Sequence, residues 1–135
     1  MTLHIGDIVR TARHAGRLRD AIACSRCGVA WREALVPGEP VVCAECDARE
    51  RGIATTELHH LAGRASSNVT IRIGVNEHRI LTTLQRAWPS ETLRNISRDP
   101  RLVRAAWFRG IADLLVLRAR AYEYDYHYGE NHESS

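Results

Sequence analysis

The segment ELHHLAGRASSNVTIRIGVNEHR, residues 57–79, combines strand-like stretches with the start of a helix and decides how the chain is interpreted. The residues up to His60 have strand character, LAGRASSN is typical of a loop, and VTIRI alternates as a second strand. Asn76 is a good N-cap for the helix that follows, which carries Leu81 and Leu84 on one face. The segment therefore predicts the order strand, loop, strand, helix.

Three histidines of this segment are candidates for chemistry. His59 and His60 are adjacent on the first strand, so their side chains point to opposite sides and cannot perform the same task. If the chain turns back through the second strand, His78 in the first turn of the helix can meet His59 across a shared metal ion. Such a two-histidine site leaves positions open for water and phosphate oxygens. Glu57 shares the strand face of His59, either as a further ligand or as a partner of a ligand.

Four cysteines form two Cys-x-x-Cys pairs, Cys24 with Cys27 and Cys43 with Cys46, with fifteen residues between the pairs. This spacing is typical of four-thiolate zinc sites, in which two tight turns converge on a tetrahedral ion. Two disulfides would be disfavoured in a reducing cytoplasm, and a redox centre would need only one such pair. We therefore predict a structural Zn²⁺ that uses every cysteine of the chain.

Helices are expected on both sides of these motifs, within a single domain. Apolar residues at helical spacing predict a helix that ends at residue 23, and Asp99-Pro100 is a typical start for a helix running to about Tyr122. The residues of this last helix that we expect to be buried are Trp107, Ile111, Leu114 and Leu115. We divide the chain into an N-terminal helix (1–23), zinc knuckles (24–52), the strand–strand–helix motif (53–88), C-terminal helices (89–122) and a disordered polar tail (123–135). The predicted fold class is α+β, with a small zinc-stapled core and flanking helices.

Composition and charge indicate a soluble globular protein with a polyanionic partner. The 135 residues are 44% apolar and 26% charged, and no stretch is apolar enough for a membrane span, so we expect a cytoplasmic protein that contacts no membrane. All 19 basic residues are arginine, whose forked donors suit phosphate. Residues 1–122 hold these 19 arginines against 12 acidic residues, a net charge of +7. We expect the protein to contact DNA through its phosphates.

With these motifs in place, residues 24 to about 86 resemble the HNH endonuclease family, most strongly in ELHHLAGR and VNEHR. The resemblance implies a treble-clef-like ββα-metal fold, with His59 as the first metal ligand, His60 as the general base and His78 as the last metal ligand. The middle asparagine of the family motif corresponds either to Asn68, as a catalytic residue that orients the base, or to Ser66, where related sequences run G-R-x-N.

The activity implied by this resemblance is metal-dependent hydrolysis of DNA phosphodiester bonds. Imidazole can deprotonate water near neutral pH, and a divalent cation, Mg²⁺, Mn²⁺, Ni²⁺ or Zn²⁺, would stabilise charge on the phosphate. Arg64 and Arg79, close in sequence to the histidines, are the best candidates for phosphate contacts. The alternative is a non-catalytic zinc-binding module on the same scaffold that binds DNA or protein.

Overall fold

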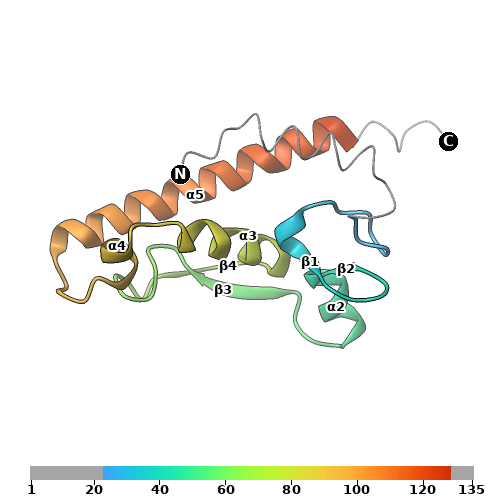
Figure 1. Ribbon diagram of the computed structural model, residues 1–135, viewed down its shortest axis with the longest axis horizontal. Coiled ribbons are helices and arrows are strands. Elements are labelled where there is room, and N and C mark those ends of the chain that lie inside the picture. Colours follow the sequence, from blue (N-terminus) through green and yellow to red (C-terminus); the bar gives the residue numbers. More distant parts are fainter. Residues whose placement is uncertain (1–22, 129–135) are drawn as a thin grey trace.

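The computed structural model describes residues 23–128, shown in Figure 1, as a mixture of short antiparallel sheets and helices. The elements in chain order are η1 (Arg32–Ala34), β1 (Leu35–Val36), β2 (Val42–Cys43), α2 (Ala44–Glu50), β3 (Thr56–His60), β4 (Thr70–Gly74), α3 (Val75–Arg86), α4 (Ser90–Arg94) and α5 (Pro100–Tyr128). This composition confirms the α+β class. The helix expected to end at residue 23 lies outside the described residues except for its last position.

The cysteine pairs are carried by a knuckle and a small hairpin. Strands β1 and β2 pair antiparallel, with Leu35 opposite Cys43 and Val36 opposite Val42. The intervening prolines and glycine form the turn, as expected of residues that cannot continue a helix. Strand β2 leads directly into the short helix α2, so the second cysteine pair spans a strand end and a first helical turn.

The segment of residues 57–79 forms a β-hairpin followed by a helix, as predicted. Strands β3 and β4 pair antiparallel, from Thr56 opposite Gly74 to His60 opposite Thr70, and α3 packs against both strands. The predicted N-cap was wrong in detail, because α3 begins at Val75 and its N-cap residue is Gly74. Asn76 instead lies inside the helix, 6% exposed, and its side-chain oxygen accepts a hydrogen bond from the backbone N–H of Glu45 at 3.0 Å.

Helix α5 is longer than the sequence predicted. It continues to Tyr128 instead of ending near Tyr122, so residues 123–128 are helical and not part of a disordered tail. Tertiary contacts explain the extension: the ring of Tyr124 packs edge-on against Trp31 with centroids 5.5 Å apart, and its hydroxyl donates to the carbonyl of Gly28 at 3.4 Å. These contacts hold the end of the helix against the cysteine-bearing region. Residues 129–135 lie outside the described part of the chain.

The face of α5 that packs against the rest of the protein is lined by small residues as well as by leucine. Ala106 and Leu117 are buried, and between them the backbone of Gly110 lies so close to the chain after β3 that a Cβ would overlap the carbonyl oxygen of Leu61. The prediction that Ile111 and Leu115 are buried was wrong, since they are 44% and 64% exposed. Trp107 and Leu114, the other two residues predicted there, are half-buried and pack against core clusters.

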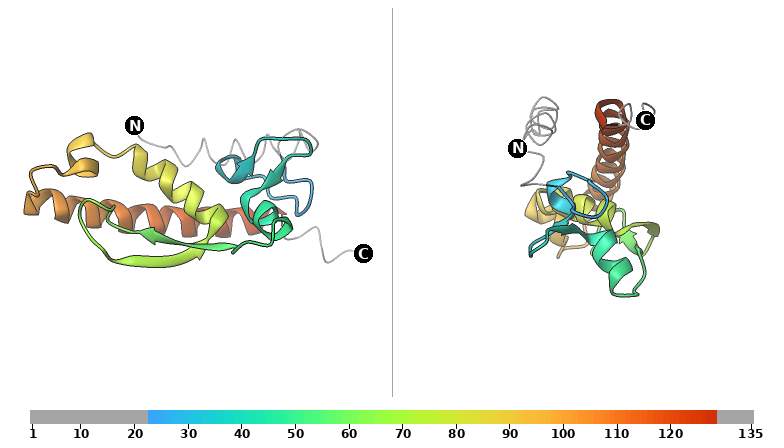
Figure 2. Two further views of the ribbon diagram at one scale, coloured as in Figure 1. Left: turned by 90° about the horizontal axis from the view of Figure 1, so that it is seen from below. Right: turned by 90° about the vertical axis from the view of Figure 1, so that its right-hand side faces the viewer.

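The described part of the molecule is elongated, as Figures 1 and 2 show from three directions. The β1–β2 hairpin and α2 lie at one end, and α4 with the turn into α5 lies at the other. The β3–β4 hairpin and α3 run between the two ends, so the loop of the hairpin reaches the α4 end. Within residues 23–128, no helix has both the length and the apolar character needed to cross a membrane.

Candidate functional site

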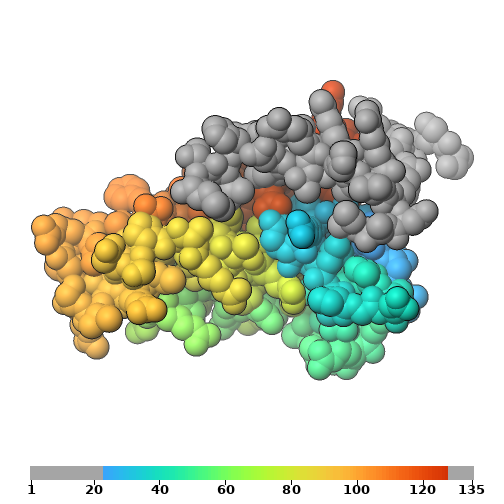
Figure 3. Space-filling view, in the orientation of Figure 1, coloured from blue at the N-terminus to red at the C-terminus, as the bar shows by residue number. Residues whose placement is uncertain are grey.

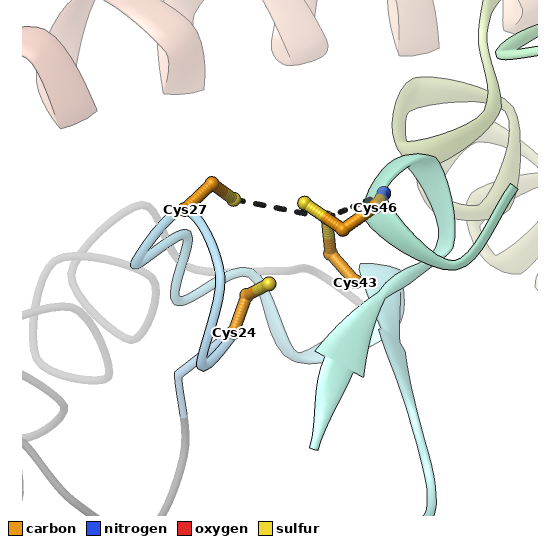
Figure 4. A group of neighbouring side chains, drawn as sticks. All are labelled: Cys24, Cys27, Cys43 and Cys46. Carbon is orange, nitrogen blue, oxygen red and sulfur yellow. Dashed lines mark hydrogen bonds between the residues drawn. The ribbon is translucent and has the colours of Figure 1, made fainter. Parts of the chain in front are cut away.

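The four cysteine side chains converge on one point, as Figure 4 shows. Their sulfur atoms all lie within 4.8 Å of one another, and the Sγ atoms of Cys27 and Cys43 are 3.8 Å apart. Four thiolates placed about 2.3 Å from a tetrahedral zinc ion have sulfur–sulfur distances of about 3.8 Å. The cluster of Cys24, Cys27, Cys43 and Cys46 therefore fits a structural metal site, and four thiolates are a donor set that zinc takes in such sites.

Local backbone geometry forms both halves of this cysteine cluster. In the first half, the N–H of Gly28 donates to the carbonyl of Cys24 at 2.9 Å, and Gly28 adopts the positive φ of +79° that such a tight turn requires. In the second half, Cys43 is the N-cap of α2, and its sulfur accepts from the backbone N–H of Cys46 at 3.4 Å. The two residues between the cysteines of each pair thus form a turn that aims both thiols the same way.

Electrostatics within the cysteine cluster favours a bound cation. Burial alone would raise the pKa of Cys24, but backbone N–H groups, including those of Cys27 and Arg26, stabilise its thiolate and bring its pKa down to about 6. Burial raises the pKa of Cys27 and of Cys46, and for Cys46 the neighbouring thiols raise it further. A divalent cation at the centre would compensate the negative charge that these thiols cannot accumulate by themselves.

The structure brings together three of the predicted polar side chains at the second site. His59 of β3 is 4% exposed, and its ring lies edge-on to that of His78 with centroids 5.4 Å apart. His78 comes from the first turn of α3, and its Nδ1 lies 2.6 Å from a carboxylate oxygen of Glu57. Side chains alternate along a β-strand, so Glu57 and His59 lie on the same face of β3, and both approach His78. We refer to Glu57, His59 and His78 as the histidine cluster.

His59 is held in its neutral form. Burial, together with the charges that His78 and His60 carry when protonated, lowers its pKa to about 4. A neutral imidazole has a free lone pair, which is the form that binds metal ions. The histidine cluster is nevertheless not a complete cage: within residues 23–128 the four cysteines are the only set of three or more donors close enough to share an ion.

His60 does not belong to the histidine cluster, because it follows His59 on the strand and its side chain points to the opposite face. The backbone at His60 is fixed from two sides. Its carbonyl accepts the side-chain amide of Gln85 at 3.1 Å and the backbone N–H of Gly63 at 3.0 Å. Gln85 was not singled out from the sequence, and a glutamine in the last turn of an amphipathic helix carries no signal that could have identified it.

The loop between β3 and β4 holds the two candidates for the middle position of the motif. Asn68 is exposed and makes no hydrogen bond within residues 23–128, whereas Ser66 is half-buried and its hydroxyl is enclosed without a partner. The loop is closed by other groups: the carbonyl of Gly63 accepts the N–H groups of Ser66 and Ser67, and the hydroxyl of Ser67 accepts the N–H of Val69 at 3.0 Å. The hydrogen bonds that close the loop thus come from Gly63 and Ser67 and not from Asn68.

The two arginines predicted to contact phosphate have different surroundings. Arg79 donates from Nε to the carbonyl oxygen of Glu33 at 2.9 Å, which anchors η1 to α3. Arg64 is exposed in the loop after β3 and has no partner within the described residues. Arg64 therefore remains a free guanidinium, and Arg79 is at least partly used within the fold.

Comparisons of the chain with protein-family models, with curated proteins and with solved structures found no match.

Proposed function

We propose that the protein is a metal-dependent endonuclease of the HNH type that hydrolyses DNA phosphodiester bonds. The observation that carries the proposal is the meeting of His59 and His78, one from a hairpin and one from the helix that follows it, with Glu57 on Nδ1 of His78. A carboxylate on one ring nitrogen orients the imidazole and leaves the other nitrogen for a metal ion. This arrangement supports Glu57 as the partner of a ligand.

In the proposed reaction, His60 accepts a proton from the water that attacks phosphorus. The bond between phosphorus and the 3′-oxygen then breaks, and that oxygen takes a proton from solvent. A divalent cation held by His59 and His78 would supply positive charge to the phosphate oxygens and the departing 3′-oxygen. Because His60 lies on the other face of β3 from the histidine cluster, proton transfer and charge stabilisation are assigned to separate side chains.

The test is cleavage of supercoiled plasmid by the zinc-loaded protein with Mg²⁺, Mn²⁺, Ni²⁺ or Zn²⁺ added in turn. His60→Ala should lose most of the cleavage yet keep the exchangeable cation and DNA affinity. His59→Ala and His78→Ala should lose cation affinity along with activity, with partial rescue at high metal concentration. His127→Ala, in the last turn of α5, is the matched control and should cleave as the wild type does. Cleavage by His60→Ala at the wild-type rate would exclude His60 as the base.

A second function, a non-catalytic zinc-binding module, is favoured by two observations. Within residues 23–128 the histidine cluster lacks a third ligand close enough to share an ion, and Asn68 is exposed in its loop. Metal stoichiometry distinguishes the two functions. The nuclease should hold one tightly bound zinc ion and a second, exchangeable cation that is lost in the His59→Ala variant, whereas the module should hold the zinc ion alone.

A further inference from the structure

An open cleft of about 640 Å³ lies between the β3–β4 loop and the segment that joins α4 to α5. One wall carries Arg64, Ser66 and Asn68, and the other carries Arg94, Asn95 and Arg98. No acidic residue lines the cleft. Figure 3 shows the green atoms of the hairpin meeting the gold and orange atoms of α4 and the start of α5 near this end of the molecule.

The three arginines of the cleft carry charge that the fold does not neutralise. None of Arg64, Arg94 and Arg98 forms an ion pair within residues 23–128. Asp99, the carboxylate next in sequence to Arg98, is fully engaged elsewhere: its two oxygens accept the side chain of Arg101 at 3.1 and 2.7 Å, and one also accepts the backbone N–H of Arg101 at 2.8 Å. The cleft therefore gathers three positive charges, and the carboxylate that follows Arg98 in sequence is bonded to Arg101 instead.

The wall that carries Arg98 is built in an unfavourable backbone conformation. Asn95 and Arg98 both have positive φ, +38° and +52°, which for residues other than glycine costs about 1 kcal/mol each. The buried Asn95 maintains the turn, since its side-chain oxygen accepts the N–H of Asp99 and its carbonyl accepts the N–H of Arg98, both at 3.0 Å. A position that would suit glycine thus holds a long cationic side chain, as is typical of strain retained for function.

The opposite wall contains a buried hydroxyl that is not paired. Within residues 23–128 the hydroxyl of Ser66 has no hydrogen-bond partner, although buried polar groups are nearly always paired. The loop that carries Ser66 begins immediately after His60, and the N–H of Gly63 is bonded to the carbonyl of His60 at 3.0 Å. The cleft is therefore attached to the end of the strand that bears the proposed base.

We propose that this cleft is a phosphate subsite, which holds a backbone phosphate of the nucleic-acid strand next to the one that is cleaved. Guanidinium groups bind phosphate oxygens through paired, charge-assisted hydrogen bonds, and the cleft is lined by three of them. The inference rests on the proposed function for the identity of the ligand as a nucleic acid. It adds a site that positions the strand without reading its sequence.

The test compares DNA binding by Arg94→Gln and Arg98→Asn with binding by Arg118→Gln. Asparagine tolerates positive φ, so Arg98→Asn removes the charge without adding strain, and the exposed Arg118 of α5 provides a control of equal charge change outside the cleft. Anisotropy of a labelled duplex, measured without added divalent cation, should show an affinity about tenfold lower for each cleft variant. The slope of log affinity against log salt should fall by about 1. The control should stay close to the wild type.

A titration with inorganic phosphate, followed by the NMR signals of the arginine Nε–Hε groups, separates phosphate binding from DNA binding. Saturable shifts that disappear in Arg98→Asn, together with its weakened DNA binding, would support the subsite. Equal losses of DNA affinity in Arg98→Asn and Arg118→Gln would overturn it, as would phosphate binding in the cleft with unchanged DNA affinity. If the wild type cleaves DNA and the cleft variants bind it normally, only this inference fails. If the wild type neither binds nor cleaves DNA, the proposed function fails and the inference with it.

Discussion

The imidazole of His59 is buried on the face of β3 that meets α3, and this position makes the stability of the fold depend on pH. Its pKa is about 4 in the folded protein and about 6.5 in an unfolded chain. Between these values the unfolded chain binds a proton that the folded protein does not. The free energy of unfolding should therefore be unaffected by His59 above about pH 6.5 and should fall as the pH drops from there towards 4.

We expect the melting temperature of the zinc-loaded wild type to fall more steeply between pH 7 and pH 5 than that of His59→Gln, which has no group that titrates at this position. Both proteins share the cysteine cluster, so acid release of its metal contributes to both curves equally. Differential scanning calorimetry at several pH values measures the difference. If the melting temperatures of the two proteins fall equally with pH, His59 takes up no proton on unfolding in this range, and its pKa is not lowered by the fold.

Gly110 lies where helix α5 crosses the backbone of Leu61, so its replacement by alanine should destabilise the fold. A methyl group there would overlap a backbone carbonyl, that of Leu61, which cannot move aside as a flexible side chain could. We expect Gly110→Ala to lower the free energy of unfolding by about 2 kcal/mol or more, despite the higher helix propensity of alanine. Gly52 also has a positive φ, but an added Cβ there would meet open space. Urea denaturation should therefore show a smaller decrease in the free energy of unfolding for Gly52→Ala, about 1 kcal/mol. A stabilised Gly110→Ala would contradict the close crossing.

At the scale of single elements, α5 depends on a cap at its start. A side-chain oxygen of Asp99 accepts the N–H of Arg101 at 2.8 Å, so it satisfies a backbone donor that the first turn leaves unpaired. Asp99→Ala should lower the melting temperature, and Asp99→Asn should retain most of the stability because its amide oxygen still accepts. Thermal melts of the two variants at neutral pH measure the effect. If both variants melt together, the cap bond contributes nothing measurable.

Elements with strong local signals were predictable from the sequence. The strand of alternating residues that became β4 and the start of α5 at Pro100 are both observed, because each depends on residues within a few positions. The meeting of His59 with His78 followed from strand parity and the return of the hairpin. These parts of the fold and of the candidate site needed no knowledge of distant contacts.

The features that the sequence could not reveal depend on tertiary contacts. Asn76 has the character of a cap, but Glu45, far away in the chain, uses its side-chain oxygen. The extension of α5 depends on packing of Tyr124 against Trp31, and the burial of Gly110 on the approach of Leu61. The cleft lined by Arg64, Arg94 and Arg98 lies between two segments that no local sequence pattern relates. The sequence therefore showed these arginines but not that they lie close together.

For the whole molecule, we expect the cysteine cluster to decide whether the fold forms. Binding of zinc to four-cysteine sites contributes on the order of 10 kcal/mol at neutral pH, comparable with the stability of a domain. Cys43 is buried, ligates the proposed ion and caps α2, so Cys43→Ser should lose zinc and unfold. Metal analysis and circular dichroism test this, with Ser25→Ala, between Cys24 and Cys27, as a control. An unchanged melting curve for Cys43→Ser would contradict it.

The hydrogen bond between Glu45 and Asn76 connects the helix that carries Cys46 to the helix that carries His78. Glu45 lies in sequence between Cys43 and Cys46, and Asn76 lies two residues before His78 on α3. Peroxide that oxidises the thiols would expel the metal and free the first turn of α2. Amide exchange should then quicken at Glu45 and in the first turn of α3, while the paired amides of β3 and β4 stay slow. We therefore expect loss of the metal to loosen the first turn of α3, which carries His78, while the β3–β4 hairpin stays paired.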